Sequence, residues 1–354
     1  MIKTIFNTLI LATAQAAAAP ATPPSQAATA PAPIVAQTPA ASANPAQNPV
    51  AAPTTTPNDI ISTAPPADWV AINPANLLVM TLAPGARNKP RQVVIQLISP
   101  PFSQGWVGNI RALATAHWWD GTAIVRVQDN YVTQWGDPNG DDKAKAKKLP
   151  EGLMAVSQSE YTPVTHITSK ERPSALSEAA RSGGAAYQLA HWVLRDSYAP
   201  GVKFQNGWPT GHDDTKSWPL HCYGMVGVGR NLSPDTGTGA ELYAVIGHAP
   251  RHLDRNIALV GRVIEGMENL SSLARGTGPL GFYKTPAERT LILSVRLASE
   301  LPKALQPRFE YLSTESDSFA SYASARANRH DAFFIQPAGG ADICNIPVPV
   351  RRAK

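Results

Sequence analysis

Short apolar runs, separated by Gly, Pro, Asn and Asp, follow one another between residues 77 and 298. Each run has the length of a β-strand and is too short for an ordinary helix, and most are rich in Val, Ile, Leu and Tyr. The runs lie at 77–82, 93–98, 122–127, 131–134, 225–229, 242–246, 257–264 and 291–298. Such a series predicts a mainly β protein.

Two segments between these runs have the spacing of short helices. After Ser103, a candidate N-cap, the apolar residues of 107–114 recur on one helical face. Residues 267–273 give a second, shorter signal that Gly276 ends. Many strands with two short helices predict a closed antiparallel barrel.

The first 66 residues have a different composition. Only two of them, Lys3 and Asp59, are charged, and most of the others are Ala, Pro, Thr, Gln and Asn. Such a segment cannot bury enough apolar surface to offset the conformational entropy lost on ordering it. We therefore predict a disordered Ala/Pro-rich linker over residues 17–67, with the folded domain beginning at residue 68.

Residues 1–16 have the features of an export signal. Lys3 supplies the positive charge, residues 5–12 are mostly apolar, and Ala14-Gln15-Ala16 matches a cleavage site before Ala17. The apolar run is too short to span a bilayer stably. We expect a signal peptide that is removed on export to the periplasm, and a mature chain with no stable membrane insertion.

Two further segments lie outside the strand pattern. Residues 138–220 are rich in Gly, Pro, Ser, Asp and Lys, and we interpret them as an insertion in a domain of residues 68–301. Within the insertion, Ser174–Trp192 has a helical pattern that Gly183-Gly184 interrupts. Residues 302–354 form a C-terminal extension that we expect to pack on the domain, and we expect the mature chain to be a monomer.

The chain has two cysteines, Cys222 and Cys344. In an exported protein an even number of cysteines suggests a disulfide, which here would close a loop of about 120 residues. The alternative is two separate buried thiols. Both remain open, because the geometry that a disulfide requires cannot be read from the sequence.

The charge pattern argues against some functions. The formal net charge is +5, but the basic residues are spread out, and the densest cluster, at 143–148, is typical of a solvated loop. No basic stripe alternates with aromatic residues, so we do not expect nucleic-acid binding. His248 and His252 have a spacing that can bind zinc on a helix, but Pro250 between them disfavours a helix, and we predict no metal site.

Six segments occur in a fixed order: Asn109–Leu113, Trp119–Thr122, Ile124–Val127 with Tyr131–Asp137, Gly224–Gly229, Gly239–Tyr243, and Leu253-Asp254 with Leu259–Met267. In this order they resemble motifs of the cyclophilin family of peptidyl-prolyl cis-trans isomerases. In the third, Tyr131-Val132-Thr133-Gln134-Trp135-Gly136-Asp137 resembles the family's Phe-Met-x-Gln-Gly-Gly-Asp. Their order, with Arg126 and Gln134 at the family's separation, makes the resemblance specific. It implies a closed eight-stranded antiparallel barrel with two short helices over most of residues 77–297.

The resemblance also implies an activity, the rotation of an X-Pro peptide bond. It assigns catalysis to Arg126 and Gln134, since an arginine donor aimed at the prolyl nitrogen favours the pyramidal nitrogen of the transition state. The implied substrate-binding residues are Tyr131, Val132, Gly229, Tyr243, Leu253, His252 and Ile257. The barrier of about 18–20 kcal/mol comes from amide resonance, so no cofactor is needed. The implied partners are proline-containing unfolded or flexible polypeptides.

Several positions depart from the family's pattern. His252 lies where many members have Trp, Ile257 where they have His, and Glu241 where they have Gln. Two functions remain open: an isomerase that assists the folding of exported proteins, and a peptide-binding chaperone module with weak or lost turnover. Without the resemblance, Arg126 would be interpreted as a surface arginine that forms a salt bridge.

Overall fold

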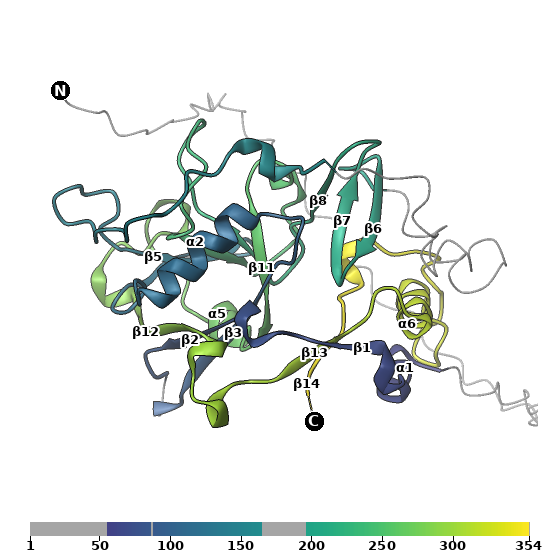
Figure 1. The fold of residues 1–354 in the computed structure, drawn as a ribbon. Coiled ribbons are helices and arrows are strands. Elements are labelled where there is room, and N and C mark those ends of the chain that lie inside the picture. The colour runs from purple at the N-terminus through teal and green to yellow at the C-terminus, as the bar shows by residue number, and fades with distance from the viewer. Residues whose placement is uncertain (1–54, 86–87, 165–195, 354) are drawn as a thin grey trace, which may run out of the picture. The chain divides into compact units, whose positions relative to one another are not determined.

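A closed barrel of eight strands forms the centre of the computed structural model, which describes residues 55–85, 88–164 and 196–353 (Figure 1). Every neighbouring pair of strands is antiparallel. In hydrogen-bonded order the strands are β10 (Leu242–Val245), β5 (Val132–Gly136), β4 (Ala123–Val127), β12 (Thr290–Leu297), β2 (Leu77–Leu82), β3 (Arg91–Leu97), β11 (Leu259–Glu265) and β9 (Met225–Val228). The predicted fold class is confirmed, and each of the eight apolar runs overlaps one barrel strand.

The two predicted helices are α2 (Gln104–Thr115) and α5 (Glu268–Ser271). One face of α2 is buried, through side chains that recur at helical spacing from Trp106 to Leu113. Ser103 takes the N-cap position, but its φ is 53° and its side chain accepts no capping hydrogen bond. The carboxylate of Glu160 instead accepts from the backbone N–H of Gly105, at 3.0 Å.

Strands β2 and β3 are buried on both faces. Their inner side chains, such as Leu78 and Val93, join the barrel core, while Leu77 and Val79 join a second cluster with Phe309. Phe309 belongs to a three-stranded sheet of β1 (Trp69–Ala71), β13 (Phe309–Leu312) and β14 (Val350–Arg352). The double burial explains why residues 77–82 are almost continuously apolar instead of alternating.

A helix, α1 (Pro57–Thr63), lies within the segment predicted to be a disordered linker, and it contacts α6 (Asp317–Ala327). The prediction of disorder is therefore wrong for residues 57–67. A capping box between Thr56 and Asp59 starts the helix, and packing against α6 supplies burial that the local composition does not reveal. The predicted signal peptide and most of the predicted linker lie outside the described residues.

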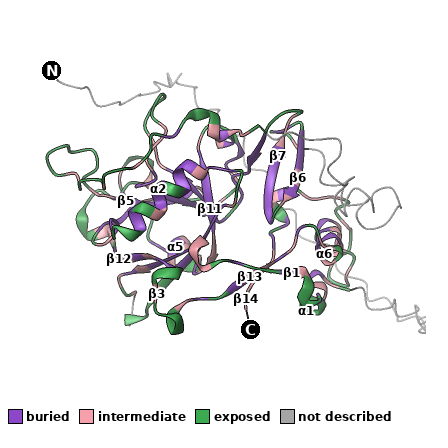
Figure 2. Ribbon diagram, viewed as in Figure 1, coloured by how far each residue is buried: buried purple, intermediate pink, exposed green. Residues whose placement is uncertain are grey.

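The predicted insertion contains a second three-stranded sheet, formed by β6 (Gly201–Gln205), β7 (Trp208–His212) and β8 (Ser217–Pro219). Buried residues extend from the barrel and α2 into β7 (Figure 2). The first part of the insertion packs along α2, where Tyr161 stacks on Trp106 with ring centroids 5.2 Å apart. The helical pattern at Ser174–Trp192 lies outside the described residues.

A disulfide joins Cys222, just before β9, to Cys344 in the C-terminal extension. The two cysteines are therefore bonded and are not separate buried thiols. The Cα atoms of this pair are 5.0 Å apart. In the described part of the chain, no helix combines the length and the apolar character that crossing a bilayer requires.

Candidate active site

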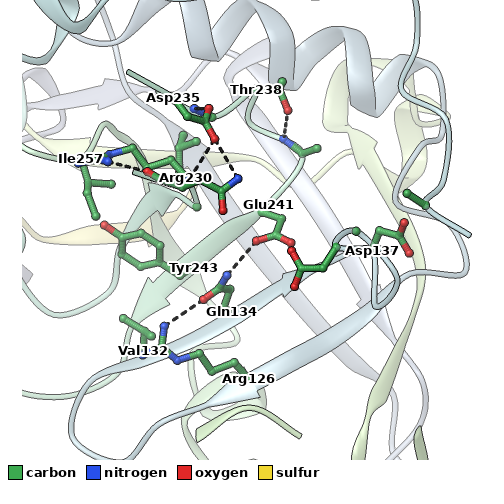
Figure 3. Close-up of a pocket in the computed structure, with 18 of the residues that line it drawn as sticks. Arg126, Val132, Gln134, Asp137, Arg230, Asp235, Thr238, Glu241, Tyr243 and Ile257 are labelled. Atoms are coloured by element: carbon green, nitrogen blue, oxygen red, sulfur yellow. Dashed lines mark hydrogen bonds between the residues drawn. The ribbon is translucent and has the colours of Figure 1, made fainter. Parts of the chain in front are cut away.

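A cleft of about 540 Å³ lies beside β4, β5 and β10. Eight of the nine sequence-predicted site residues line it: Arg126, Tyr131, Val132, Gln134, Gly229, Tyr243, Leu253 and Ile257. Figure 3 labels five of them, Arg126, Val132, Gln134, Tyr243 and Ile257. His252 is exposed and does not line the cleft, although its ring stacks on Tyr131 with centroids 6.5 Å apart. Its predicted contact with substrate stays a prediction.

The strand register places four residues of neighbouring strands opposite one another, in a row formed by Arg126, Gln134, Tyr243 and Gly227. A β-bulge in β4 between Ile124 and Arg126 places Arg126 opposite Gln134 of β5. Gln134 lies opposite Tyr243 of β10, which in turn lies opposite Gly227 of β9. Residues opposite one another on neighbouring strands face the same side of a sheet, so the side chains of Arg126, Gln134 and Tyr243 gather at the cleft.

The Arg126 guanidinium is held by neutral acceptors. Its Nη1 donates to Gln134 Oε1 at 3.2 Å, its Nε donates to the carbonyl oxygen of Leu280 at 2.7 Å, and its Nη2 donates to Gln128. The guanidinium also lies over the rings of Tyr131 and Phe282, 5.5 and 5.2 Å from their centroids. Among the described residues, no carboxylate forms a salt bridge with it, so the alternative of a salt-bridged surface arginine is wrong.

Burial lowers the pKa of Arg126 below its usual value, while interaction with Tyr131 acts in the opposite direction. Arginine nevertheless stays protonated in proteins. The cleft therefore holds a permanent cation that is partly desolvated and that no carboxylate of the described residues pairs with. Such a cation interacts strongly with a polar atom brought next to it.

Gln134 connects Arg126 to a carboxylate. Its amide nitrogen donates to Glu241 Oε2 at 3.0 Å, while its amide oxygen faces Arg126 (Figure 3). Burial raises the pKa of Glu241, and the nearby Asp141 and Asp137 add to the rise, while the hydrogen bond from Gln134 opposes it. Gly229 packs closely against this pair, because an added Cβ would lie 3.0 Å from Glu241 Cβ and 3.4 Å from Gln134 Nε2.

An apolar seat lies beside the row. We define it as Tyr131, Val132, Tyr243, Leu253 and Ile257, all of which line the cleft. Val132 and Tyr243 are buried, and Tyr131 and Ile257 pack against them. A cation at the edge of a small apolar surface can receive a group that is apolar with one polar atom, such as a proline ring and its amide.

Sequence reasoning missed three residues that shape the cleft. Leu280 and Phe282 lie in the loop after Gly276, where Leu280 has a φ of 56° and turns its carbonyl toward Arg126. His221 is completely buried behind Tyr243. None of the three belongs to a local motif, and only contacts across the fold identify them.

Comparisons with known proteins agree with this geometry. Residues 105–297, more than half of the chain, match the family model described as cyclophilin type peptidyl-prolyl cis-trans isomerase/CLD. Among solved structures, the cyclophilin AquaCyp293 from Hirschia baltica is 20% identical with a TM-score of 0.55, covering 83% of this chain and 96% of its own. This similarity supports the fold.

A cyclophilin type peptidyl-prolyl cis-trans isomerase from Cryptosporidium parvum is 12% identical, with a TM-score of 0.37 and coverage of 63% and 96%. A search of curated proteins gives no match. The family model covers the barrel from α2 to β12 and includes every residue of the row and of the apolar seat. The chain therefore belongs to the family of cyclophilin-type peptidyl-prolyl cis-trans isomerases.

Proposed function

We propose that this isomerase assists the folding of exported proteins, with Arg126 as the catalytic residue. The observation that carries the proposal is a partly desolvated guanidinium, held by Gln134 and the carbonyl of Leu280, at the edge of the apolar seat. A proline ring would occupy the seat, with its peptide nitrogen toward Arg126. Gln134 would fix the backbone of the substrate.

Catalysis requires that the twisted amide be bound more tightly than the planar one. Rotation removes amide resonance and localises a lone pair on the prolyl nitrogen, which then becomes a hydrogen-bond acceptor. A guanidinium N–H already directed at that position stabilises the twisted state without reorganisation. The neutral acceptors around Arg126 support this role, because they orient the cation without neutralising it.

The test is proline isomerisation in a short peptide, measured by NMR exchange with wild-type protein and with Arg126→Ala. We expect Arg126→Ala to lower kcat/KM by about 10²–10³-fold, the range seen when one preorganised donor is removed. Arg296→Ala is a matched control, because Arg296 pairs with Asp120 and does not line the cleft. We expect the control to keep wild-type activity.

The same experiment separates the two functions that the sequence leaves open. A wild-type protein that binds the peptide without accelerating exchange would support the chaperone module, which the departures at His252 and Ile257 favour. An Arg126→Ala variant as active as wild type would refute the catalytic assignment. Loss of activity in both variants would point to a general loss of structure.

Export to the periplasm is the second part of the proposal. It is supported by the signal-like residues 1–16 and by the disulfide, since stable disulfides are typical of oxidising compartments. The full chain and a variant lacking residues 2–16 can be expressed in a Gram-negative bacterium and fractionated. We expect the full chain in the periplasmic fraction with Cys222 and Cys344 resistant to alkylation. A full chain found in the cytoplasm with reactive thiols would refute export.

A further inference from the structure

A series of buried, hydrogen-bonded polar side chains lies directly behind the apolar seat and has no role in the mechanism above. His221 is 0% exposed, and both of its ring nitrogens have partners. Its Nε2 is 2.9 Å from the Tyr243 hydroxyl, and its Nδ1 is 2.9 Å from Asp254 Oδ1. The backbone N–H of His221 donates to the same carboxylate oxygen, at 2.9 Å.

The series of polar side chains continues away from the cleft through two ion pairs. Arg251 Nε donates to Asp254 Oδ2 at 2.6 Å, and its two terminal nitrogens donate to the carboxylate of Asp196 at 2.7 and 2.9 Å. The side chains of Asp196, Arg251 and Asp254 are at most 3% exposed. Asp254 is therefore fixed on both of its oxygens, and it fixes His221 in turn.

These contacts determine where the protons lie. An ionised carboxylate can only accept, so His221 Nδ1 carries a hydrogen and donates it to Asp254. Burial lowers the pKa of His221, with Arg251 and His252 acting in the same direction and Asp254 opposing them. A neutral imidazole that donates through Nδ1 accepts through Nε2, so the Tyr243 hydroxyl donates to His221.

The hydrogen bond between Tyr243 and His221 holds the Tyr243 ring, which is part of the apolar seat. The Tyr243 ring lies against β9, where a Cβ on Gly227 would come within 2.3 Å of Tyr243 Cζ. Its hydroxyl is directed to His221, which does not line the cleft. Asp254 follows Leu253, which lines the cleft. His221 thus connects the Tyr243 ring to the loop that carries Leu253.

We propose that His221 is a positioning residue, which holds the Tyr243 ring and the Leu253 loop at the spacing that accepts a proline ring. The inference rests on the proposed use of the apolar seat for proline. A stabilising role alone would not require such a series, since buried ion pairs are commonly no more stabilising than packed apolar groups. Its contribution is geometric, because His221, Asp254 and Arg251 each have a side-chain partner on both sides.

The test measures the Kd of a prolyl peptide by NMR titration, together with its exchange rate, for Tyr243→Phe, His221→Leu and the double variant. Tyr243→Phe removes a single oxygen and keeps the ring. We expect each single variant to weaken peptide binding about three- to tenfold, the effect of one lost hydrogen bond. The change should raise KM and leave kcat unaffected. The double variant should bind no more weakly than His221→Leu, because both changes remove the same contact.

Two further variants separate positioning from stability. His221→Gln keeps an acceptor for the tyrosine and should restore most of the binding that His221→Leu loses. Tyr322→Phe is the matched control, because Tyr322 is also a buried tyrosine and donates a single hydrogen bond, to the carbonyl of Pro347, at 2.7 Å. It should lower the melting temperature and leave the Kd unchanged.

Unchanged peptide affinity in Tyr243→Phe, or losses that simply add in the double variant, would overturn the proposal. If His221→Leu does not fold, the comparison of Tyr243→Phe with Tyr322→Phe decides the question. A wild-type protein that binds the peptide without turnover would refute catalysis but leave this test intact. A wild-type protein that binds no prolyl peptide would refute both.

Discussion

Gln134 lies between a cation and a carboxylate. Arg126 donates to its amide oxygen, and its amide nitrogen donates to Glu241. An amide has one accepting end and one donating end, so these two neighbours determine which way it points. The carboxylate of Glu241 thereby keeps the amide oxygen of Gln134 directed at the Arg126 guanidinium.

The pKa of Glu241 leads to a prediction at this scale. A carboxyl whose pKa is raised in the folded chain stabilises the fold at low pH, and that contribution is lost as the pH rises through the folded value. At neutral pH the ionised Glu241 is therefore destabilising. We expect Glu241→Gln to raise the melting temperature at pH 7 by on the order of 1–4 °C, with no gain near about pH 3–4. Thermal unfolding across this pH range measures the effect.

Glu288 provides a control of the opposite sign. Hydrogen bonds from Thr277 and Thr285 lower the pKa of Glu288 to about 2. Its stabilisation is present above the ordinary carboxyl range and is lost as the pH falls toward 2. Glu288→Gln should therefore lower the melting temperature at pH 7, by less as the pH falls. Shifts of the same sign at pH 7 would contradict the assignment.

At the scale of elements, the N-terminus of α2 depends on the insertion. Ser103 does not cap the helix, and Glu160 accepts the N–H of Gly105 instead. A Cβ on Gly105 would lie 2.8 Å from Val156 and 2.9 Å from Glu160, so only glycine allows this approach. Gly105 is therefore the point at which α2 packs against residues 156–160 of the insertion.

Two glycines of α2 test this packing. We expect Gly105→Ala to reduce the free energy of unfolding by about 1–3 kcal/mol, because the added methyl group overpacks the contact. Gly108 is exposed and has nothing within 4 Å of an added Cβ, so Gly108→Ala should increase it by about 0.5–1 kcal/mol through helix propensity. Urea denaturation measures both. Equal stabilisation by the two changes would show that residues 156–160 do not pack on α2.

At the scale of the described chain, the C-terminal extension is part of the folded unit. Phe309 packs on the outer faces of β2 and β3, and Cys344 is bonded to Cys222, one residue after His221. The loop closed by this disulfide spans 122 residues. In the chain-entropy model, a loop of that length stabilises the fold by at most about 4–5 kcal/mol.

We therefore expect the double variant Cys222→Ser/Cys344→Ser to lose about 2–5 kcal/mol of unfolding free energy. Wild-type protein in a reducing agent should show the same loss, and the double variant should not respond to that agent. Denaturant unfolding with and without dithiothreitol measures all four conditions. An unfolding midpoint of wild-type protein that reduction leaves unchanged would contradict the prediction.

The sequence by itself determined the strands of the barrel and helix α2. Strand length, apolar spacing and turn residues act between neighbours along the chain, so a local pattern is enough to reveal these elements. The residues expected at the cleft came from the family resemblance, and eight of the nine line it. The family resemblance then identified Arg126 and Gln134 as a pair. Their facing positions follow from the bulge in β4, which only the structure shows.

Only the tertiary structure decided the pairing of Cys222 with Cys344, the folding of α1 and the contacts of His221 and Leu280. Each of these features joins segments far apart in the chain, where spacing carries no information about distance. The prediction of disorder at 57–67 failed for this reason, since the burial that orders α1 comes from a helix about 260 residues later.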